Sequence, residues 1–337
     1  MQPIGKVETE MDKFFTDELS QSELTLKEKF LSSFYGFVVG DALGVPYEFR
    51  YRGTFQVSGM ASYGTWNQPA GTWSDDTSMT LALMENLSEM GDWRTLMEKF
   101  VAFRDEGAYT PFHKAFDVGN TCAQAILRFE LGFSPLEAGS TDETANGNGA
   151  LMRVFPLAFS LYEETDFYRR SDIIRECTRL THGHLRSQVA SVLYCELIRN
   201  LLQGMVLGEA MQQTGKNFVH YYNGSTDLMS EYENHFERDL IEGTQKKAAP
   251  NSTAYVVDTF SAALWCLQNT NSYQAAMLTA VNLGGDTDTT AAITGALAGI
   301  LYGFEAIPEN WRKTLQNEQL LKTISQRFCD TVLSQRI

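Results

Sequence analysis

The sequence predicts an all-α protein built as a single domain. Apolar residues recur at helical spacing in most segments, whereas the alternation of apolar and polar residues in a half-buried strand is almost absent. Of the 337 residues, 43% are hydrophobic and 20% are charged, so the chain can bury a full core as one large domain or two small ones. Helices joined by loops account for nearly every segment, and this favours one helical domain.

Helical periodicity gives the individual elements in chain order. The first helix is followed by a segment with two glycines and a proline, residues 40–49, which predicts a loop that presents Asp41 and Glu48. The central helix has a glycine at every fourth position over residues 295–303, so neighbouring helices can approach it closely. The expected helices span residues 24–39, 79–87, 93–103, 187–202, 255–267, 273–281, 291–304 and 311–333, and two more begin after residues 117–121 and 146–153.

Two polar segments lie outside this helical frame. Residues 1–23 form an acidic arm with apolar residues at helical spacing, which either folds on the body, stays partly disordered, or offers a helix to a groove on a partner. Residues 214–253 are rich in Asn, Gly and Ser and are interpreted as a surface insertion with two short helical pieces. The domain itself is then expected to span residues 24–337.

The charge of the chain limits its partners. The net charge is −15 and no cluster of Lys and Arg is present, which argues against binding to nucleic acid. A protein this acidic that binds a phosphorylated ligand needs metal ions, backbone amides or helix N-termini to offset its own charge.

The sequence favours a cytoplasmic protein without a membrane segment. Five cysteines are widely spaced, odd in number and never arranged as Cys-x-x-Cys, so we expect reduced, buried thiols. The chain does not start with a basic region followed by an apolar core. Its longest nearly apolar stretch, residues 291–304, is shorter than the roughly 20 residues that span a membrane.

Two acidic motifs, each directly before an apolar helix, predict a cation site. The first acidic motif is Ser-Asp-Asp-Thr at residues 74–77, and the second acidic motif is Gly-Gly-Asp-Thr-Asp-Thr at residues 284–289. Helix capping explains one carboxylate at each helix start but not two at both. If the motifs face each other, their hydroxyl and carboxylate oxygens surround a pair of hard divalent cations such as Mg²⁺ or Mn²⁺.

Three further polar motifs could serve either a site or the fold. Asp117 and Asn120 precede a helix, where they would be caps or ligand-binding residues. The Gly-rich turn at residues 146–153 offers consecutive amides to a phosphate, although it fits neither the P-loop nor the dinucleotide pattern. His182, in Thr-His-Gly-His, is either a ligand-binding or a structural histidine, since the other ligands of a zinc site are missing.

Six motifs in this order resemble those of the ADP-ribosylglycohydrolases, over about residues 28–315. The resemblance implies an orthogonal multi-helix bundle with a binuclear Mg²⁺ or Mn²⁺ centre. It also implies release of ADP-ribose from modified proteins, with arginine as the expected acceptor. The six motifs are residues 40–48, 74–77, 117–121, 147–153, 181–184 and 284–289.

The resemblance also implies roles for individual residues. Glu48 would lie over the metals near the scissile ribose, and either Glu48 or Asp117 would act as acid or base. Ser74 stands where the family usually has Thr and supplies the same hydroxyl oxygen. The expected metal ligands are Ser74, Asp75, Asp76, Asp286, Asp288 and Thr289; the expected catalytic residues are Glu48, Asp117, Asp75 and Asp288; the expected ADP-ribose contacts are Asn120, Gly147, Asn148, Gly149, His182 and Tyr255.

Two other functions remain open on the sequence alone. Some relatives in this family are structural crystallins, but a purely structural descendant need not keep both acidic motifs. Some bacterial members protect cells against ADP-ribosyltransferase toxins, and the arm of residues 1–23 could plug the active site of such a toxin. The intact acidic motifs favour catalysis, and the arm favours an added immunity role.

Overall fold

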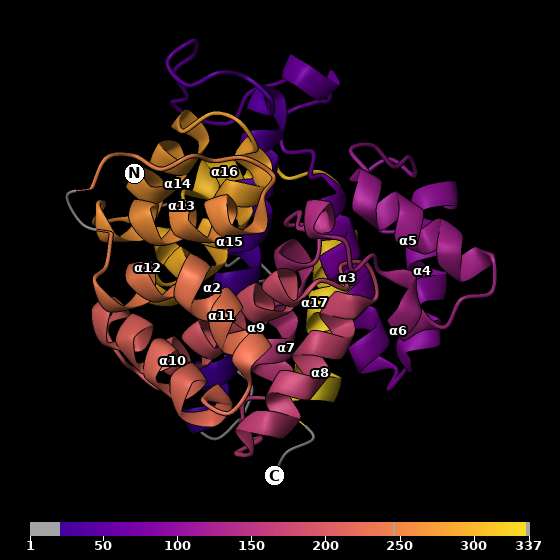
Figure 1. Cartoon of the computed structure of the whole chain (residues 1–337). Helices are drawn as coiled ribbons and strands as arrows, with labels where there is room; N and C mark the ends of the chain where they lie inside the picture. Colours follow the sequence, from indigo (N-terminus) through magenta and orange to yellow (C-terminus); the bar gives the residue numbers. More distant parts are fainter. Residues whose placement is uncertain (1–20, 245–246, 335–337) are drawn as a thin grey trace, which may run out of the picture.

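Helices form all the regular structure of the described chain (Figure 1). The structure, a computed structural model, describes residues 21–244 and 247–334, and within these ranges it has helices, short helical turns and isolated β-bridges but no strand. The all-α prediction is therefore confirmed. The α-helices are α2 (Gln21–Gly44), α3 (Asp75–Ser88), α4 (Trp93–Glu106), α5 (Asn120–Glu130), α6 (Pro135–Ala138), α7 (Phe155–Ser160), α8 (Phe167–Arg179), α9 (Leu185–Leu202), α10 (Leu207–Tyr222), α11 (Thr226–His235), α12 (Glu237–Ile241), α13 (Val256–Gln268), α14 (Tyr273–Asn282), α15 (Thr287–Tyr302), α16 (Glu309–Thr314) and α17 (Glu318–Phe328).

Helices α2 and α15 pack against each other through glycines at the centre of the molecule (Figure 1). A Cβ atom added to Gly36, Gly40 or Gly44 of α2 would lie 2.2 to 2.3 Å from backbone atoms of α15. Gly295 and Gly299 of α15 face the backbone of α2 in the same way, as predicted for the central helix. Backbones this close leave no room for a side chain at these positions. The contact therefore fixes the end of α2 beside the start of α15.

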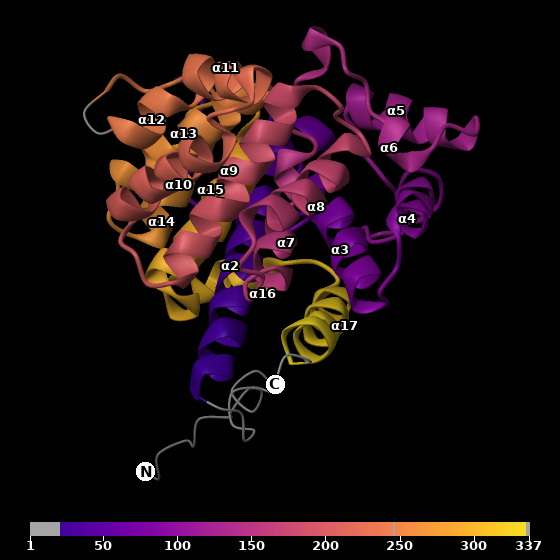
Figure 2. The same ribbon diagram turned by 60° about the horizontal axis from the view of Figure 1, so that its bottom comes forward.

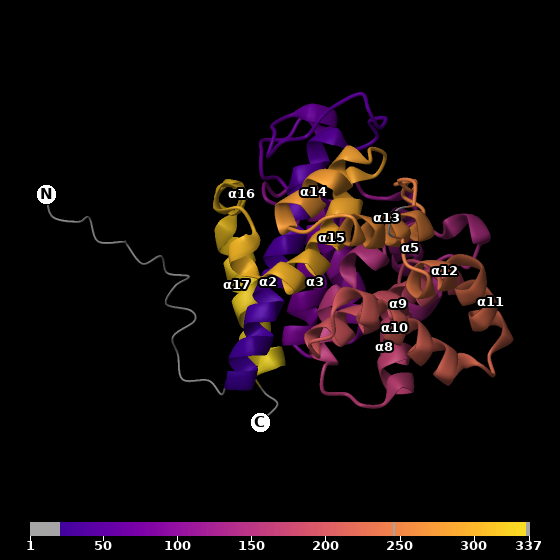
Figure 3. The same cartoon turned by 90° about the vertical axis from the view of Figure 1, so that its left-hand side faces the viewer.

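The other helices surround this pair. Helices α13 and α14 pack on α15, whereas α7, α8, α10 and α11 pack on α9. Helices α4, α5 and α6 lie beyond α3, on the side of the molecule away from α10 and α12 (Figures 1 and 2). Near the end of the chain, α17 returns to lie beside α3 and α2 (Figure 3).

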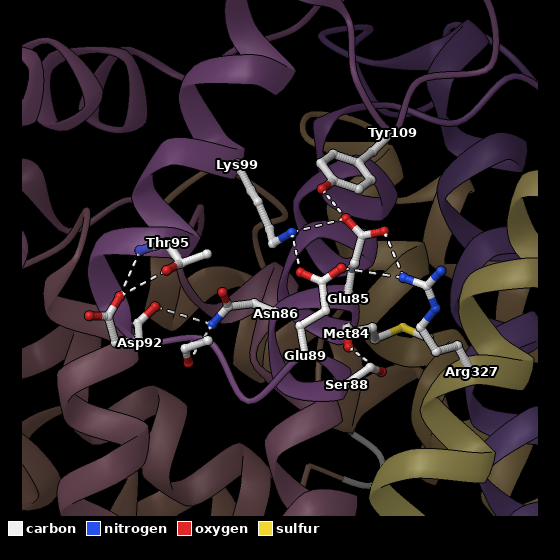
Figure 4. A network of polar contacts seen from close by, with 11 residues as sticks. Met84, Glu85, Asn86, Ser88, Glu89, Asp92, Thr95, Lys99, Tyr109 and Arg327 are labelled. Carbon is white, nitrogen blue, oxygen red and sulfur yellow. Dashed lines mark hydrogen bonds and ion pairs between the residues drawn. The ribbon is translucent and has the colours of Figure 1, made fainter.

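A polar network joins α3, α4 and α17 (Figure 4). Lys99 of α4 contacts the carboxylates of Glu85 and Glu89 at 3.1 and 2.8 Å. Arg327 of α17 contacts the same two carboxylates at 3.4 and 3.3 Å. Burial alone would raise the pKa of Glu85, but hydrogen bonds from Tyr109 and Lys99 outweigh it and hold this pKa below its usual value. The network ties α3, which begins with the first acidic motif, to its neighbours.

Three helix ends differ from their predicted positions. Helix α2 continues through residues 40–44, because the glycines there let it pack on α15 instead of ending it. The predicted final helix is divided into α16 and α17 near Asn317, which adopts φ +42° and caps α17 with its side chain. Gly303 ends α15 with φ +80°, and its Cβ position meets no atom within 4 Å, so it is not part of the helix contact.

The polar segment of residues 214–253 is mostly helical. It contains the second half of α10 and all of α11 and α12, which is more helix than the two short pieces expected. Phe218, Tyr232 and Phe236 are buried, and the rings of Phe218 and Tyr232 stack with centroids 5.1 Å apart. The polar composition therefore concealed a helical layer that packs on α9.

The remaining expectations concern the arm, the thiols and the membrane. Residues 1–20 of the predicted arm lie outside the described residues, and residues 21–23 begin α2. All five cysteines are free and buried, as predicted. Among the described helices, none combines the length and the apolar character that crossing a membrane requires.

Candidate active site

The two acidic motifs meet at one cavity. The first motif begins α3 and the second begins α15. The Thr289 hydroxyl donates a hydrogen bond to Asp76 Oδ1 at 3.2 Å, which joins residues that are 213 positions apart. Asp75 and Asp286 line the same cavity, which has a volume of about 180 Å³. The α2–α15 contact and the α3 helix thus bring both motifs to a shared site.

The start of α3 is capped without its two aspartates. The Asp41 carboxylate of α2 accepts hydrogen bonds from the backbone amides of Ser74 and Thr77, at 2.9 and 3.1 Å. The Ser74 hydroxyl accepts from the amide of Asp76 at 3.3 Å. These bonds satisfy amides that a helix N-terminus leaves unpaired. The carboxylates of Asp75 and Asp76 are therefore free for another role.

The start of α15 uses only part of its carboxylate oxygens. Oδ1 atoms of Asp286 and Asp288 both accept from the backbone amide of Thr289, at 3.3 and 3.0 Å. Asp286 Oδ2 accepts from the side-chain amide of Asn148 at 2.8 Å. Within the described chain, Asp288 Oδ2 and Asp76 Oδ2 are buried without a hydrogen-bond partner. Helix capping therefore does not account for the four aspartates.

Glu48 and Asp117 complete a carboxylate cluster with Asp288. One oxygen from each of these three residues lies within 4.8 Å of the other two. Glu48 follows the short turn η1 (Val45–Tyr47), and Trp66 Nε1 donates a hydrogen bond to its Oε2. Asp117 has φ +55°, which is uncommon outside glycine, and neither it nor Asn120 caps α5. The capping alternative for these two residues is therefore wrong.

Burial and mutual repulsion raise the pKa of these carboxyl groups. Burial is the main cause for Glu48, whose pKa rises to about 11, and the charge of Asp117 adds to it. Burial, followed by the charges of Glu48 and Asp117, holds the pKa of Asp288 well above its usual value. The pKa values of Asp75 and Asp76 are also well above their usual range, first through burial and then through neighbouring carboxylates. Buried carboxylates this crowded can all be ionised only if a positive charge lies among them.

The atoms left unpaired suit a hard divalent cation. Two buried carboxylate oxygens of the described chain have no partner, Asp76 Oδ2 and Asp288 Oδ2, and they come one from each acidic motif. Oxygen ligands with a high negative charge are those that hard cations such as Mg²⁺ select. The donors that the two motifs bring to the site are all oxygens, from Ser74, Asp75, Asp76, Asp286, Asp288 and Thr289. The residues present therefore fit a cation centre.

The Gly-rich turn forms another part of the cavity wall. The amide of Asn148 donates to the Ala254 carbonyl at 2.9 Å, and Gly147 forms a β-bridge with Tyr255. The turn is thereby fixed to the segment before α13. Tyr255 does not line the cavity, and its ring lies beneath the guanidinium of Arg186 at 5.9 Å. The other predicted ADP-ribose contacts do line the cavity: Asn120, Gly147, Asn148, Gly149 and His182.

His182 is a buried, neutral histidine at this turn. Burial, followed by the charge of Arg153, lowers its pKa to about 3. Its Nδ1 lies 2.8 Å from Thr181 Oγ1, which accepts a hydrogen bond from the buried Arg153 guanidinium at 2.9 Å. The Nε2 edge faces the turn, because a Cβ atom on Gly147 would lie 3.4 Å from it. His184 instead caps α9, so the two histidines of this motif do not act as a pair.

Three residues that build the site were not identified from the sequence. Asp41 was expected in the loop with Glu48, but it is fully buried in α2 and anchors the first acidic motif. Trp66 holds Glu48 from within a Gly-, Ser- and Thr-rich loop, where a tryptophan among small polar residues was the available signal. Arg153 supports His182, and a basic residue within an otherwise apolar stretch was the corresponding signal.

Comparison with known proteins identifies the family. The ADP-ribosylglycohydrolase family model matches residues 22–336. The chain is 30% identical over 308 residues to the ADP-ribosylarginine hydrolase Tri1 of Serratia proteamaculans, covering 89% of this chain and 79% of that protein. It is also 30% identical over 303 residues to the ADP-ribosyl-(dinitrogen reductase) glycohydrolase of Rhodospirillum rubrum, covering 86% and 91%.

Solved structures agree with this assignment. An ADP-ribosylglycohydrolase-related protein complex contains a chain that superposes with a TM-score of 0.76 at 30% sequence identity, covering 91% of this chain and 99% of the other. The resemblance inferred from six motifs is therefore confirmed, and the chain belongs to the ADP-ribosylglycohydrolase family.

Proposed function

We propose that this protein hydrolyses the N-glycosidic bond between ADP-ribose and a modified arginine side chain. The carboxylate cluster, of which Glu48 and Asp117 line the cavity, together with the unpaired oxygens of both acidic motifs, is the observation that carries the proposal. Arginine as the acceptor follows from the relative named ADP-ribosylarginine hydrolase. A structural protein would lose stability by keeping buried carboxyl groups that repel one another, so catalysis explains the site better than a crystallin-like role.

The reaction needs stabilisation of positive charge and one proton transfer. As the bond from C1 to nitrogen breaks, positive charge develops on C1 and the ring oxygen of the ribose. The oxygen of a water molecule bonds to C1 and the water gives up one proton, while the departing guanidine nitrogen keeps the electron pair of the broken bond and takes up a proton. Carboxylates of Asp75, Asp117 and Asp288 around the sugar stabilise the developing charge. Glu48 and Asp117 face each other in the cluster and are the candidates for proton transfer.

The cation centre is expected to hold two Mg²⁺ or Mn²⁺ ions. Bound there, such ions supply a water molecule of lowered pKa and a fixed position for the ribose diol. The chain contributes the ligand positions: Asp41 holds the first acidic motif through two backbone amides, and Asn148 holds Asp286. The proposed ligands are Ser74, Asp75, Asp76, Asp286, Asp288 and Thr289.

The rest of the cavity suits the ADP-ribose moiety. With a net charge of −15, the protein binds a pyrophosphate best through uncharged donors, and the backbone amides of Gly147 and Gly149 are of this kind, whereas that of Asn148 is bonded to the Ala254 carbonyl. The neutral ring of His182 adds a donor beside this turn. Asn120 lines the same cavity, and Tyr255 lies next to it through its bridge to Gly147.

The function is tested by release of ADP-ribose from peptides that carry it on arginine, serine or cysteine, with Mg²⁺ present. We expect release from the arginine-linked peptide. Asp288→Asn should reduce the rate by about 100-fold or more while the circular dichroism of the helices is unchanged. Asp172→Asn, at an exposed carboxylate of α8, is the matched control and should keep the wild-type rate. Full activity of Asp288→Asn would reject the proposed site.

An added immunity role is supported by the arm alone, through its apolar residues at helical spacing. If the arm plugs the active site of an ADP-ribosyltransferase toxin, a protein that lacks residues 1–20 should bind the toxin more weakly and hydrolyse the arginine-linked peptide at the wild-type rate. Unchanged toxin binding would exclude the plug.

A further inference from the structure

Three aromatic side chains lie in contact beside the cavity, and one of them lines it. Phe49 lines the cavity, yet 61% of its surface is exposed. Its ring meets Trp66 edge-on with centroids 6.2 Å apart, and Trp66 lies 5.7 Å from the ring of Phe116. We refer to Phe49, Trp66 and Phe116 as the aromatic rim.

Each member of the aromatic rim is attached to a carboxyl group of the carboxylate cluster. Phe49 directly follows Glu48 in the chain, and Phe116 directly precedes Asp117. Trp66 Nε1 donates a hydrogen bond to Glu48 Oε2. The rim therefore lies beside the two carboxyl groups that can transfer a proton to the leaving group.

The position of Phe49 is held at a cost in free energy. Its φ of +63° is unfavourable for a residue other than glycine. The amide of Phe49 donates to the Gly285 carbonyl at 2.6 Å, and the amide of Gly285 donates to the Arg50 carbonyl at 2.9 Å. The second acidic motif thus holds Phe49 in place. These bonds keep the exposed ring of Phe49 at the edge of the cavity, where a ligand can reach it.

The faces of these rings are not occupied by cations of the protein itself. Arg50, the basic residue closest to Phe49 in sequence, lies instead over the rings of Tyr47 and Phe55, at 5.8 and 5.0 Å. None of the cation–π contacts within residues 21–244 and 247–334 involves the aromatic rim. A planar cation from a ligand can therefore lie against it.

We propose that the aromatic rim binds the guanidinium group of the modified arginine and so selects arginine-linked substrates. This inference rests on the proposed hydrolase function. Guanidinium is planar, weakly hydrated and attracted to aromatic faces, whereas a serine or cysteine linkage presents no positive charge to the rings. The group is a cation in the substrate and becomes one again when the departing nitrogen has taken its proton. The rim thus holds both the substrate and the leaving group.

The test distinguishes the binding of the guanidinium group from the binding of the ADP-ribose part of the substrate. Phe49→Leu and Phe116→Leu keep an apolar side chain but remove the aromatic face, whereas Phe49→Tyr keeps that face. Phe112→Leu, at another exposed phenylalanine outside the rim, is the matched control. For each variant, kcat and KM are measured with the arginine-linked peptide, and the Kd of free ADP-ribose, which has no guanidinium, is measured by calorimetry.

Loss of one aromatic face should raise KM for the arginine-linked peptide about three- to tenfold, with kcat and the Kd of ADP-ribose little changed. Phe49→Tyr, which keeps the aromatic face, should raise KM less than Phe49→Leu, and Phe112→Leu should behave as wild type. Unchanged KM in both rim variants, or an equal loss of affinity for ADP-ribose, would overturn the proposal. If the wild-type protein releases no ADP-ribose from arginine, the proposed hydrolase function itself is rejected. If the wild type is active and the rim variants are equally active, only the proposed binding of guanidinium by the rim is rejected.

Discussion

At the scale of single residues, His182 shows how a buried charge can set the hydrogen-bonding state of a neighbour. Arg153 has only donors, so Thr181 Oγ1 must accept from it and keeps its own proton for another partner. That proton can be donated to His182 Nδ1, 2.8 Å away. A ring that accepts at Nδ1 carries its hydrogen on Nε2, the edge that faces the Gly-rich turn. This chain of contacts predicts that Arg153 and Thr181 are positioning residues that favour His182 as a donor toward the cavity.

This arrangement predicts the effect of Thr181→Val. Loss of the hydroxyl should weaken the preference of His182 for the Nε2–H tautomer, which the ¹⁵N chemical shifts of its ring report. It should also raise KM for the arginine-linked peptide about fivefold, because the hydrogen bond from His182 to the substrate is weakened. Thr178→Val is the matched control, because the Thr178 hydroxyl bonds only the Ile174 carbonyl of its own helix. Unchanged ring shifts in Thr181→Val would contradict the proposed relay.

The lowered pKa of His182 also predicts a pH dependence of stability. Below the ordinary pKa of 6.5 the unfolded chain binds a proton at this ring, whereas the folded protein does not until the pH approaches about 3. Stability is therefore lost as the pH falls through this window, by about 2 kcal/mol between pH 7 and pH 5. Urea unfolding of the wild type and of His182→Gln at both pH values measures the difference. An equal pH dependence in the two proteins would show that His182 does not carry it.

At the scale of elements, the glycine contact between α2 and α15 predicts a large effect from one methyl group. In Gly40→Ala the new Cβ would lie 2.2 Å from the Ala291 carbonyl oxygen, so the helices must separate. We expect a loss of about 1 to 3 kcal/mol in the free energy of unfolding. Gly208→Ala in α10, where a Cβ meets nothing within 4 Å, is the control and should be neutral or slightly stabilising. Similar stabilities of the two variants in urea would exclude the close contact.

The same elements show what the sequence could and could not predict. Helical periodicity placed α3, α4, α9, α13 and α14 close to their positions, because each contains apolar residues that recur at helical spacing. It ended α2 too early, because glycine was interpreted as a helix breaker, whereas residues 40–44 are glycine-rich for close packing on α15. The meeting of the acidic motifs could be expected from their doubled carboxylates. The role of Asp41 could not be predicted from the sequence, since its partners Ser74 and Thr77 lie more than thirty residues away.

At the scale of the whole molecule, the raised pKa values of the buried carboxyl groups predict that the stability of the protein depends on cations and on pH. Asp75, Asp76 and Asp288 have pKa values raised in the folded state, first by burial. In the metal-free protein such groups contribute stability below their unfolded pKa near 4, and that stability is lost as the pH rises toward their folded values. A cation that binds among these carboxylates should restore the stability that their mutual repulsion removes.

This predicts that Mg²⁺ or Mn²⁺ raises the midpoint of thermal unfolding relative to EDTA, and raises it more at pH 8 than at pH 5. His182 alters the stability with pH in the opposite direction. Its contribution cancels when the midpoint in EDTA is subtracted from the midpoint with the cation at the same pH. Asp76→Asn removes one of the repelling charges and one unpaired oxygen, so it should be more stable than wild type in EDTA and respond less to the cation. Asp172→Asn, away from the site, should follow the wild type. A cation response that is absent, or equally large in Asp76→Asn, would mean that the acidic motifs converge without holding an ion.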